Sequence, residues 1–358
     1  ILFISTKAIT QNIFFNNFIN NTNLDVTLGC SDILNLEFKK KKIKFNFESS
    51  LVSLLNPIYF ILELIKIRKK VNNKFDLVVI NNPLASIYIR LALIFTNQKI
   101  MYFVHGYRFH SSEKNFKYFF YYYLEKILSK ITDYYININK EDYLITHKYF
   151  NIRKSNILKL PSVGLDFSKF KKYKKYKTKN SKFKIGVISA YRDNKGYNDL
   201  INIAEFLSIN KLNTEIKCYG YDDPYKYQSL INKKKLKNIT LNPFRKNIYR
   251  EIVNFDLLCH LSRREGLPVS VLEAMSLGVP AICFDIRGNK DLIKNNLNGF
   301  LVKPYNLKIF EKKIFQILTK NSNIETIKKN ISKTISPKHE IKIVNKEFTN
   351  FIIQACKN

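Results

Sequence analysis

Short apolar runs alternate with longer segments of helical periodicity along almost the whole chain. Polar or glycine-containing turns bound the short runs, as is typical of buried strands, and the longer segments repeat apolar residues every three or four positions. The predicted strands span residues 1–5, 25–28, 42–47, 76–81, 100–104, 134–138, 156–160, 183–189, 215–219, 239–241, 256–261, 280–284 and 299–302. The predicted helices span residues 11–20, 57–71, 83–95, 115–131, 140–149, 197–209, 225–235, 247–253, 268–277, 289–294 and 307–320.

This regular alternation predicts an α/β protein with two Rossmann-like, doubly wound parallel sheets. A chain of 358 residues is long enough for two separate cores. We expect an N-terminal domain at 1–165, a lysine-rich linker or exposed loop at 166–183, and a C-terminal domain at 184–336. A last helix is expected within 337–358.

One stretch of the second domain, residues 256–302, carries most of the chemistry. A buried strand ends near residue 261, and a polar turn leads into a helix whose first turn contains Pro268. Gly278 then offers a left-handed stop before the next strand. Ligands of parallel sheets lie beyond the carboxyl ends of the strands, which is where the turn 262–267 is expected.

Two glutamates bracket this helix start. Glu265 precedes the helix, and Glu273 lies on its second turn. A helix N-terminus can hold a phosphate, and a carboxylate one turn further can accept hydrogen bonds from ribose hydroxyls. On spacing alone, an ordinary surface helix with two solvated glutamates is an equal alternative.

The residues around the two glutamates resemble the donor-site signature of the retaining, GT-B-fold glycosyltransferases of family 4. They read Glu265-Gly266-Leu267-Pro268, then Glu273-Ala274, Gly278 and Pro280, and the later runs 285–291 and 298–301 are also similar. The resemblance implies two domains facing each other across a cleft, with the nucleotide sugar on the second. It also implies that the helix 337–358 packs back on the first domain, which is the acceptor side.

The resemblance extends to other loops. Arg192 and Lys195 follow the first strand of the second domain, where the family has an arginine and a Lys-Gly pair that neutralise the diphosphate. Position 190, the commonest place of that arginine, is alanine here. Arg245 lies in a loop, 244–248, whose backbone faces the uracil ring in similar enzymes. The resemblance places the diphosphate near the amides at 266–268 and makes Glu265 a contact of the sugar.

In the first domain, His105-Gly106 follows a predicted strand and resembles the histidine that lies near the transferred sugar. The run Tyr107-Arg108-Phe109-His110 extends the match toward a bacterial polysaccharide branch, as do residues 124–126 and 138–143. We therefore expect His105 and Glu265 to be the catalytic residues. Without the resemblance, a structural role in the core would be the more common one for a histidine such as His105.

Composition bounds the alternatives. The net charge of +33 fits nucleic-acid binding or an anionic membrane surface, but lysine is enriched throughout, as AT-rich coding DNA would give. We expect no nucleic-acid partner and some membrane attraction. Five scattered cysteines favour a reducing cytoplasm, and no Asp-x-Asp follows a predicted strand, which favours catalysis without a metal. The apolar run 51–67 contains charged residues, which predicts a buried or interfacial helix and not a membrane span. The missing initiator Met suggests a trimmed chain.

The expectation is a cytoplasmic or peripheral membrane enzyme without a cofactor. It moves a hexose or N-acetylhexosamine from a nucleotide sugar, UDP-linked by preference, to a glycan or polyprenyl-linked glycan acceptor in polysaccharide biosynthesis. Three rivals stay open: a non-catalytic sugar or nucleotide binder, a UDP-sugar epimerase on the same fold, and a basic nucleic-acid or membrane-surface protein.

Overall fold

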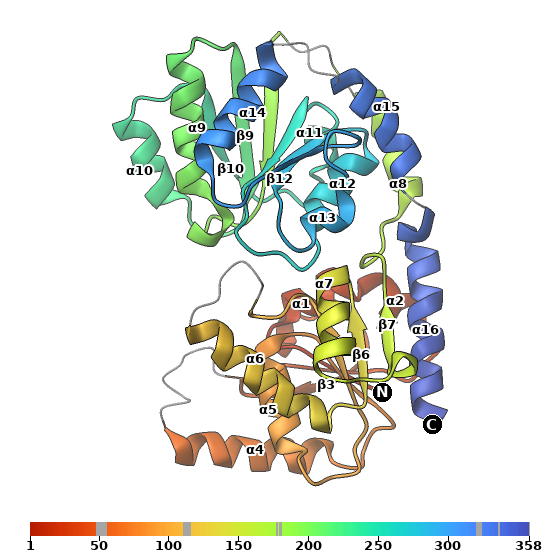
Figure 1. Ribbon diagram of the computed structural model, residues 1–358. Helices are drawn as coiled ribbons and strands as arrows, with labels where there is room; N and C mark the ends of the chain where they lie inside the picture. Colours follow the sequence, from red (N-terminus) through yellow and green to blue (C-terminus); the bar gives the residue numbers. More distant parts are fainter. Residues whose placement is uncertain are drawn as a thin grey trace. The chain divides into compact units, whose positions relative to one another are not determined.

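The structure is a computed structural model that describes residues 1–47, 56–109, 116–176, 178, 181–319, 324–335 and 337–357. It divides the chain into two compact units (Figure 1). Unit 1 comprises Ile1–Gly164 and Ile341–Asn358, and unit 2 comprises Leu165–Glu340. The C-terminal helix therefore belongs to unit 1, although it follows unit 2 in the sequence.

Unit 1 is built on a seven-stranded parallel sheet with the order β3-β2-β1-β4-β5-β6-β7. Its strands are β1 (Leu2–Ile4), β2 (Thr27–Cys30), β3 (Lys41–Lys44), β4 (Val78–Ile80), β5 (Ile100–Val104), β6 (Tyr134–Asn137) and β7 (Ile157–Lys159). The inner strands are buried on both faces, which explains their continuous apolar runs. The register pairs Leu2 with both Thr27 and Val78.

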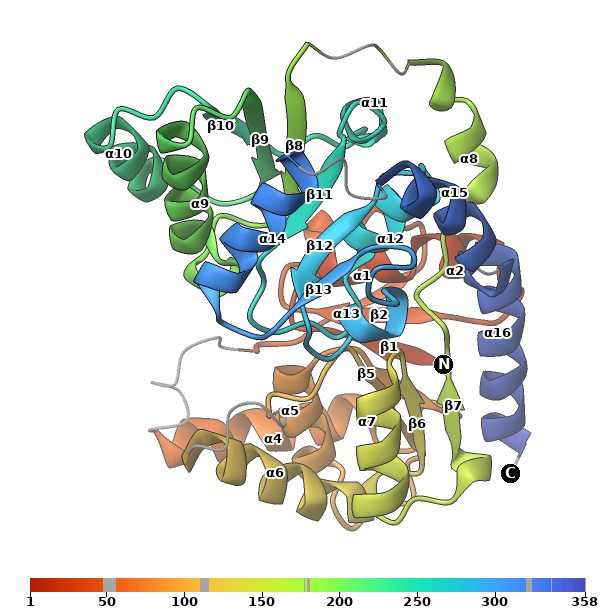
Figure 2. The ribbon, with the colours of Figure 1, turned by 45° about the horizontal axis from the view of Figure 1, so that its top comes forward.

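Helices cover both faces of this sheet (Figures 1 and 2). They are α1 (Ala8–Phe14), α2 (Asn16–Asn21), α4 (Pro57–Val71), α5 (Pro83–Ala92), α6 (Phe116–Leu128), α7 (Lys140–Leu144) and α16 (Ile341–Lys357). One core lies under α4 and α5 and contains Ile67 and Tyr88. On the other face, Phe348 of α16 packs against Phe3 and Phe18.

Unit 2 carries a six-stranded parallel sheet with the order β10-β9-β8-β11-β12-β13. Its strands are β8 (Phe183–Ile188), β9 (Thr214–Gly220), β10 (Ile239–Pro243), β11 (Leu257–His260), β12 (Ala281–Phe284) and β13 (Phe300–Val302). Its helices are α8 (Phe167–Lys171), α9 (Tyr197–Ile209), α10 (Tyr225–Lys233), α11 (Tyr249–Ile252), α12 (Val269–Ser276), α13 (Asn289–Leu292), α14 (Leu307–Thr319) and α15 (Ile324–Thr334). Helix α9 packs with α10 and α14, and α12 packs with α13 and α15.

Both sheets confirm the expected α/β architecture. In each parallel sheet, the strand order reverses at one point: successive strands are first added on one side of the first strand and then on the other. In unit 2 the reversal lies between β8 and β11, whose connections leave toward opposite sides of the sheet. Loops that leave neighbouring strands in opposite directions open a crevice at the carboxyl edge, and this is where such sheets bind ligands. The loops after β8 and β11 therefore lie where a ligand of unit 2 is expected.

Two parts of the chain differ from the expectation. The expected linker contains α8, and its start belongs to the packing of unit 2: the rings of Phe170 and Tyr173 lie 5.1 and 5.3 Å from that of Tyr249. Helix α15 has no counterpart in the predicted elements, because only Ile327 and Ile331 of its apolar residues are buried. No helix in the part of the chain that the structure describes is both long and apolar enough to cross a lipid bilayer.

Candidate functional site

Three loops meet at the carboxyl edge of the unit 2 sheet. Gly196, at the end of the loop after β8, has φ +79°, and a Cβ there would lie 2.4 Å from the carbonyl oxygen of Leu261. The amide of Arg263 donates to the carbonyl of Asn194 at 2.9 Å. Since only glycine allows that approach, the loops after β8 and β11 are held together at the reversal point.

Glu265 is the centre of this junction. Its Oε1 accepts hydrogen bonds from Lys195 Nζ at 2.7 Å and lies 3.1 Å from His260 Nε2. Burial opposes ionisation of Glu265, but Lys195 and His260 outweigh it and hold the pKa of this carboxyl well below its ordinary value. Glu265 is thus a fixed carboxylate, and the structure brings it together with Lys195 as two predicted site residues.

His260 is a site residue that the sequence analysis missed. It is the last residue of β11, is 4% exposed, and contacts the same oxygen as Lys195. A histidine at a strand end five residues before Glu265 is a weak signal by itself, because buried histidines are common in cores. Its partner becomes visible only when the loop folds back over the strand end.

The loop after β12 supports the Glu265 loop from the other side. Arg287 is buried, and its Nε donates to the backbone carbonyl of Glu265 at 3.1 Å. Gly288 has φ +80°, and a Cβ there would lie 2.5 Å from the carbonyl oxygen of Gly266. The run 285–291, which the resemblance singled out, therefore fixes the backbone of the site.

Helix α12 begins one residue later than expected. Pro268 is its N-cap with φ −75° and ψ 104°, and no side chain caps the first turn. Because proline has no N–H, Pro268 cannot donate to a phosphate, so the expected set of amides at 266–268 reduces to Gly266 and Leu267. These residues are buried, whereas Val269 and Ser270 of the first helical turn are half-buried. Uncapped amides at a helix start favour an anion.

Glu273 lies on α12, one helical turn beyond that start. Tyr249 of α11 donates its hydroxyl to Glu273 Oε1 at 3.0 Å. Burial raises the pKa of Glu273 to about 7, although the Tyr249 hydrogen bond acts in the opposite direction. The two glutamates therefore differ: Glu265 is ionised at neutral pH, while Glu273 is close to its titration point.

The two arginines proposed for the donor site are engaged in other ion pairs. Arg192 Nε is 2.5 Å from Asp222 Oδ2 in the loop after β9, and its side chain is 64% exposed. Arg245 NH1 is 2.5 Å from Glu251 Oε1, and its guanidinium lies over the ring of Tyr219. Each would have to leave or extend this pairing to reach a ligand.

The candidate of unit 1, His105, follows β5. Its Nε2 is hydrogen-bonded to Asn81, at the end of β4, and its ring stacks on Phe103 at 4.5 Å. Burial lowers the pKa of His105 to about 3, so the imidazole is neutral at physiological pH. His110, at the end of the motif that begins here, lies outside the described residues.

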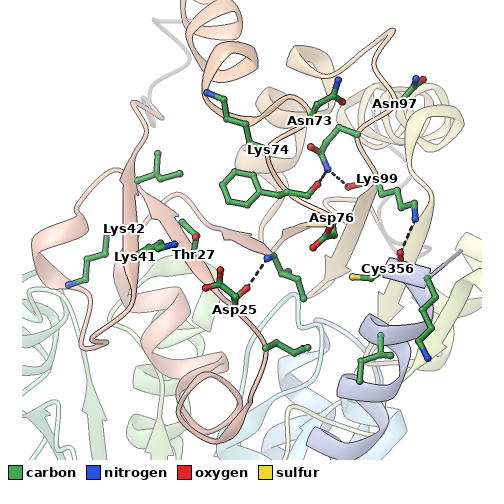
Figure 3. A pocket seen from close by; sticks show the side chains of 17 residues that line it. Asp25, Thr27, Lys41, Lys42, Asn73, Lys74, Asp76, Asn97, Lys99 and Cys356 are labelled. Carbon is green, nitrogen blue, oxygen red and sulfur yellow. Dashed lines mark hydrogen bonds between the residues drawn. The ribbon is translucent and has the colours of Figure 1, made fainter.

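Unit 1 also contains a basic hollow of about 1100 Å³ (Figure 3). Lys41, Lys74 and Lys99 line it together with Asp25 and Asp76. These residues lie at or before the starts of the strands, so the hollow is at the amino edge of the sheet, opposite to the edge where ligands of such sheets bind. We assign it no ligand. Within the described ranges, no three His, Cys, Asp or Glu side chains form a group that could hold a metal ion.

Comparisons with known proteins show what each part of the chain is similar to. The family described as "Glycosyl transferases group 1" matches residues 168–334, which is nearly all of unit 2. The UDP-Gal:alpha-D-GlcNAc-diphosphoundecaprenol alpha-1,3-galactosyltransferase of Escherichia coli is 25% identical over 84% of this chain and 84% of its own. The capsular polysaccharide biosynthesis glycosyltransferase CapM of Staphylococcus aureus is 26% identical over 92% of this chain and 90% of its own.

A solved structure shows the same fold over both units. HepE of Anabaena, in complex with UDP and glucose, superposes with a TM-score of 0.74 at 16% identity and covers 98% of each chain. The family match concerns unit 2, and the fold match extends over both units. The chain therefore carries a group 1 glycosyltransferase domain of the family 4 type in unit 2, and its two parallel-sheet units have the GT-B fold.

Proposed function

We propose that the chain is a retaining glycosyltransferase that moves a hexose or N-acetylhexosamine from a UDP-sugar to a lipid-linked glycan acceptor. The observation that carries the proposal is the Lys195–Glu265–His260 cluster, which lies at the carboxyl edge of the unit 2 sheet, where the strand order reverses between β8 and β11. A cation beside a fixed carboxylate, next to an uncapped helix start, suits a sugar hydroxyl and a diphosphate side by side.

Each unit 2 residue has a proposed part in donor binding. Glu273 accepts hydrogen bonds from the ribose hydroxyls, and Lys195 neutralises the diphosphate together with Arg192 and the amides around Gly266 and Leu267. Glu265 holds hydroxyls of the transferred sugar. Arg245 and its neighbours contact the base, beside an exposed stack of Tyr221 and Phe244 whose ring centroids are 3.9 Å apart.

The chemical step needs a group that stabilises the leaving diphosphate. The bond between the anomeric carbon and the diphosphate oxygen breaks, and Lys195 with the helix start offsets the charge that develops on that oxygen. The acceptor hydroxyl forms the new bond on the same face, and its proton passes to the diphosphate oxygen. This scheme needs no metal ion, and we propose that catalysis is metal-independent. His105 is the proposed catalytic residue of unit 1.

The names of two relatives support a proposal about the acceptor. The Escherichia coli relative takes an acceptor on diphosphoundecaprenol and forms an alpha-1,3 linkage from UDP-Gal, and the Staphylococcus aureus relative is named for capsule biosynthesis. We propose by this similarity that the acceptor here is also polyprenyl-linked and that the product enters a cell-surface polysaccharide. Work on such an acceptor would take place at the cytoplasmic side of the membrane, with the enzyme held there peripherally.

The test begins with donor binding. Calorimetric titration with UDP-Gal, UDP-Glc, UDP-GlcNAc and GDP-Man should give binding to at least one UDP-sugar, and Glu273→Ala should weaken it strongly. Wild-type affinity in that variant would remove the assignment of Glu273, and no nucleotide binding at all would remove the proposal.

Turnover then separates the rivals. Incubation of the bound UDP-sugar with a polyprenyl-diphosphate glycan should give an elongated glycan with the anomeric configuration of the donor, read by NMR. Free sugar or an isomerised UDP-sugar would indicate the epimerase alternative, and binding without any product would indicate a non-catalytic relative. Activity that disappears on adding a chelator would contradict the metal-independent scheme.

A further inference from the structure

Two helices of unit 1 carry an apolar stripe on the side that faces solvent. On α4, the exposed stripe consists of Ile58, Ile61, Leu62 and Ile65, which are 46 to 71% exposed. The core-facing side of the same helix uses different positions, among them Ile67 and Val71. An amphipathic helix normally has one apolar face. Helix α4 has a second one, at the same helical spacing, and it is not used in the fold.

Helix α6 repeats this arrangement with larger side chains. Its exposed stripe consists of Phe116, Phe119, Phe120, Tyr123 and Ile127, which are 47 to 83% exposed. The spacing is again three or four residues, so the side chains line one face of the helix. Single exposed apolar residues are ordinary, but two aligned stripes on neighbouring helices are a feature that needs an explanation.

Both stripes belong to one face of unit 1. Helices α4 and α6 each pack on α5, which lies between them in the layer that covers the sheet (Figure 1). Phe60 of α4 meets Tyr88 of α5 with ring centroids 5.0 Å apart. Arg90 of α5 forms a buried ion pair with Glu125 of α6 at 2.8 Å. The two helices are therefore fixed relative to each other.

The charges on this face have one sign. The carboxylates of the two helices, Glu63 and Glu125, are buried and paired with Lys66 and Arg90. Within α4 and α6 themselves, which the structure describes in full, the exposed charged side chains are all cations: Lys66, Arg68, Lys69, Lys70, Lys117 and Lys126. An apolar stripe flanked by lysines fits an interface with apolar and anionic components together. A second copy of the same face would bring like charges together, which disfavours a symmetric dimer.

We propose that the α4–α6 face of unit 1 docks on an anionic lipid bilayer. Its apolar stripes enter the boundary between headgroups and acyl chains, and its lysines contact the anionic headgroups. This deepens the proposed function, because a polyprenyl-linked acceptor is reached only from such a surface. Membrane docking is a property of this face alone, and it does not depend on which sugar the enzyme transfers.

The experiment measures co-sedimentation of the full chain with vesicles of phosphatidylcholine, alone or mixed with phosphatidylglycerol. The wild-type protein should bind the mixed vesicles, and the binding should weaken as salt is added. In the triple variant Lys69→Gln, Lys117→Gln, Lys126→Gln, partition should fall about 100-fold, since each lysine near the surface contributes about a factor of five. The matched control is Lys182→Gln, Lys233→Gln, Lys237→Gln, which removes the same charge from unit 2.

The apolar part is tested with Ile58→Ser, Phe116→Ser, Ile127→Ser, which should lower partition at least about tenfold. Its control, Leu34→Ser, Ile209→Ser, Tyr225→Ser, removes equally exposed apolar side chains elsewhere. Thermal melting and UDP binding of each variant report whether it is folded. Because UDP binding is measured separately, failure of the proposed function does not imply failure of the docking face, or the reverse.

Three outcomes would overturn the proposal. Equal binding to neutral and anionic vesicles would remove the role of the lysines. Equal partition of the α4–α6 variants and their controls would move the docking site elsewhere. The third outcome combines two results: the wild-type protein does not bind vesicles but is dimeric in solution, and the apolar variant is monomeric. The face would then be a protein interface.

Discussion

Lys195 Nζ lies 2.7 Å from Glu265 Oε1 and joins the loop after β8 to the loop after β11. In Lys195→Ala, the burial of Glu265 is no longer offset by a cation at this distance, so the pKa of Glu265 should rise. We expect turnover to fall about 100-fold, as when one group that stabilises a leaving oxygen is removed. The measurement is kcat and kcat/KM against pH.

The control for this variant is Lys226→Ala, which removes another lysine–carboxylate pair of unit 2. Lys226 Nζ is 2.8 Å from Asp193 Oδ1, but both side chains are about 60% exposed (59% and 62%). Exposed pairs contribute little, so activity should change by about twofold at most. If Lys226→Ala and Lys195→Ala lose the same activity, the special role of Lys195 is wrong.

His260 should act as a positioning residue for Glu265. In His260→Leu, Glu265 keeps Lys195 but loses the contact that fixes its orientation, so the KM for the UDP-sugar should rise more than kcat falls. The variant His260→Gln can restore a hydrogen bond to the carboxylate and should recover part of the lost affinity. A purely structural histidine would give no such recovery.

Glu273→Gln should stabilise the protein while it weakens nucleotide binding. The pKa of Glu273 is about 7 in the folded protein and 4.5 as its ordinary value, so the wild-type protein loses stability as pH rises from about 4.5 to about 7. The glutamine variant lacks this loss, and at pH 8 it should be more stable by about 3 kcal/mol. Melting temperatures of both proteins across this pH range, with and without UDP, are the measurement. A variant that is less stable at pH 8 would contradict the burial argument.

Gly288→Ala should damage the site far more than Gly278→Ala. Both glycines have positive φ, +80° and +83°, so both variants incur backbone strain of about 1 kcal/mol or more, and at Gly288 the ψ of −48° lies outside the left-handed helical region. At Gly288 the new Cβ also meets the carbonyl of Gly266 at 2.5 Å, whereas at Gly278 nothing lies within 4 Å. We expect a total loss of about 3 kcal/mol at Gly288, together with weaker UDP binding, because the clash moves the Glu265 loop. Urea unfolding and calorimetry give the two quantities.

His105→Ala should lower kcat and leave the affinity for UDP unchanged, since the proposed UDP contacts all belong to unit 2. Because the pKa of His105 is about 3, ionisation of this residue should not shape the pH profile between pH 5 and 8. Steady-state kinetics at saturating UDP-sugar gives kcat, and calorimetric titration with UDP gives the affinity. A large loss of UDP affinity would move His105 out of its proposed role.

The sequence predicted the layers of this protein better than the details of its site. The expected helices 57–71 and 197–209 agree with α4 and α9 at both ends, because each has a clear apolar period and an N-terminal signal. Helix α15 was missed because its surface is mostly polar. Gly278 was expected to adopt a left-handed conformation, and its φ of +83° confirms this.

The site itself depends on contacts between loops that are distant in the sequence. Local signals place Glu265 and Glu273 near a helix start. They do not show that His260 turns toward Glu265, or that Arg192 pairs with Asp222. Nor does a motif distinguish Pro268 as a helical residue from Pro268 as an N-cap, since proline suits either position. Such facts come from the tertiary structure alone.

Helix α16 has a consequence for how the protein is made. Phe348 packs among Phe3, Phe15, Phe18 and Phe103, so residues that are translated after unit 2 complete a core that was begun by residues translated before it. During translation, this aromatic surface stays open while all of unit 2 is synthesised, and exposed surface of this kind invites aggregation. Unit 1 therefore begins to emerge before unit 2 but is completed after it, and a nascent chain that stops before α16 cannot finish its core.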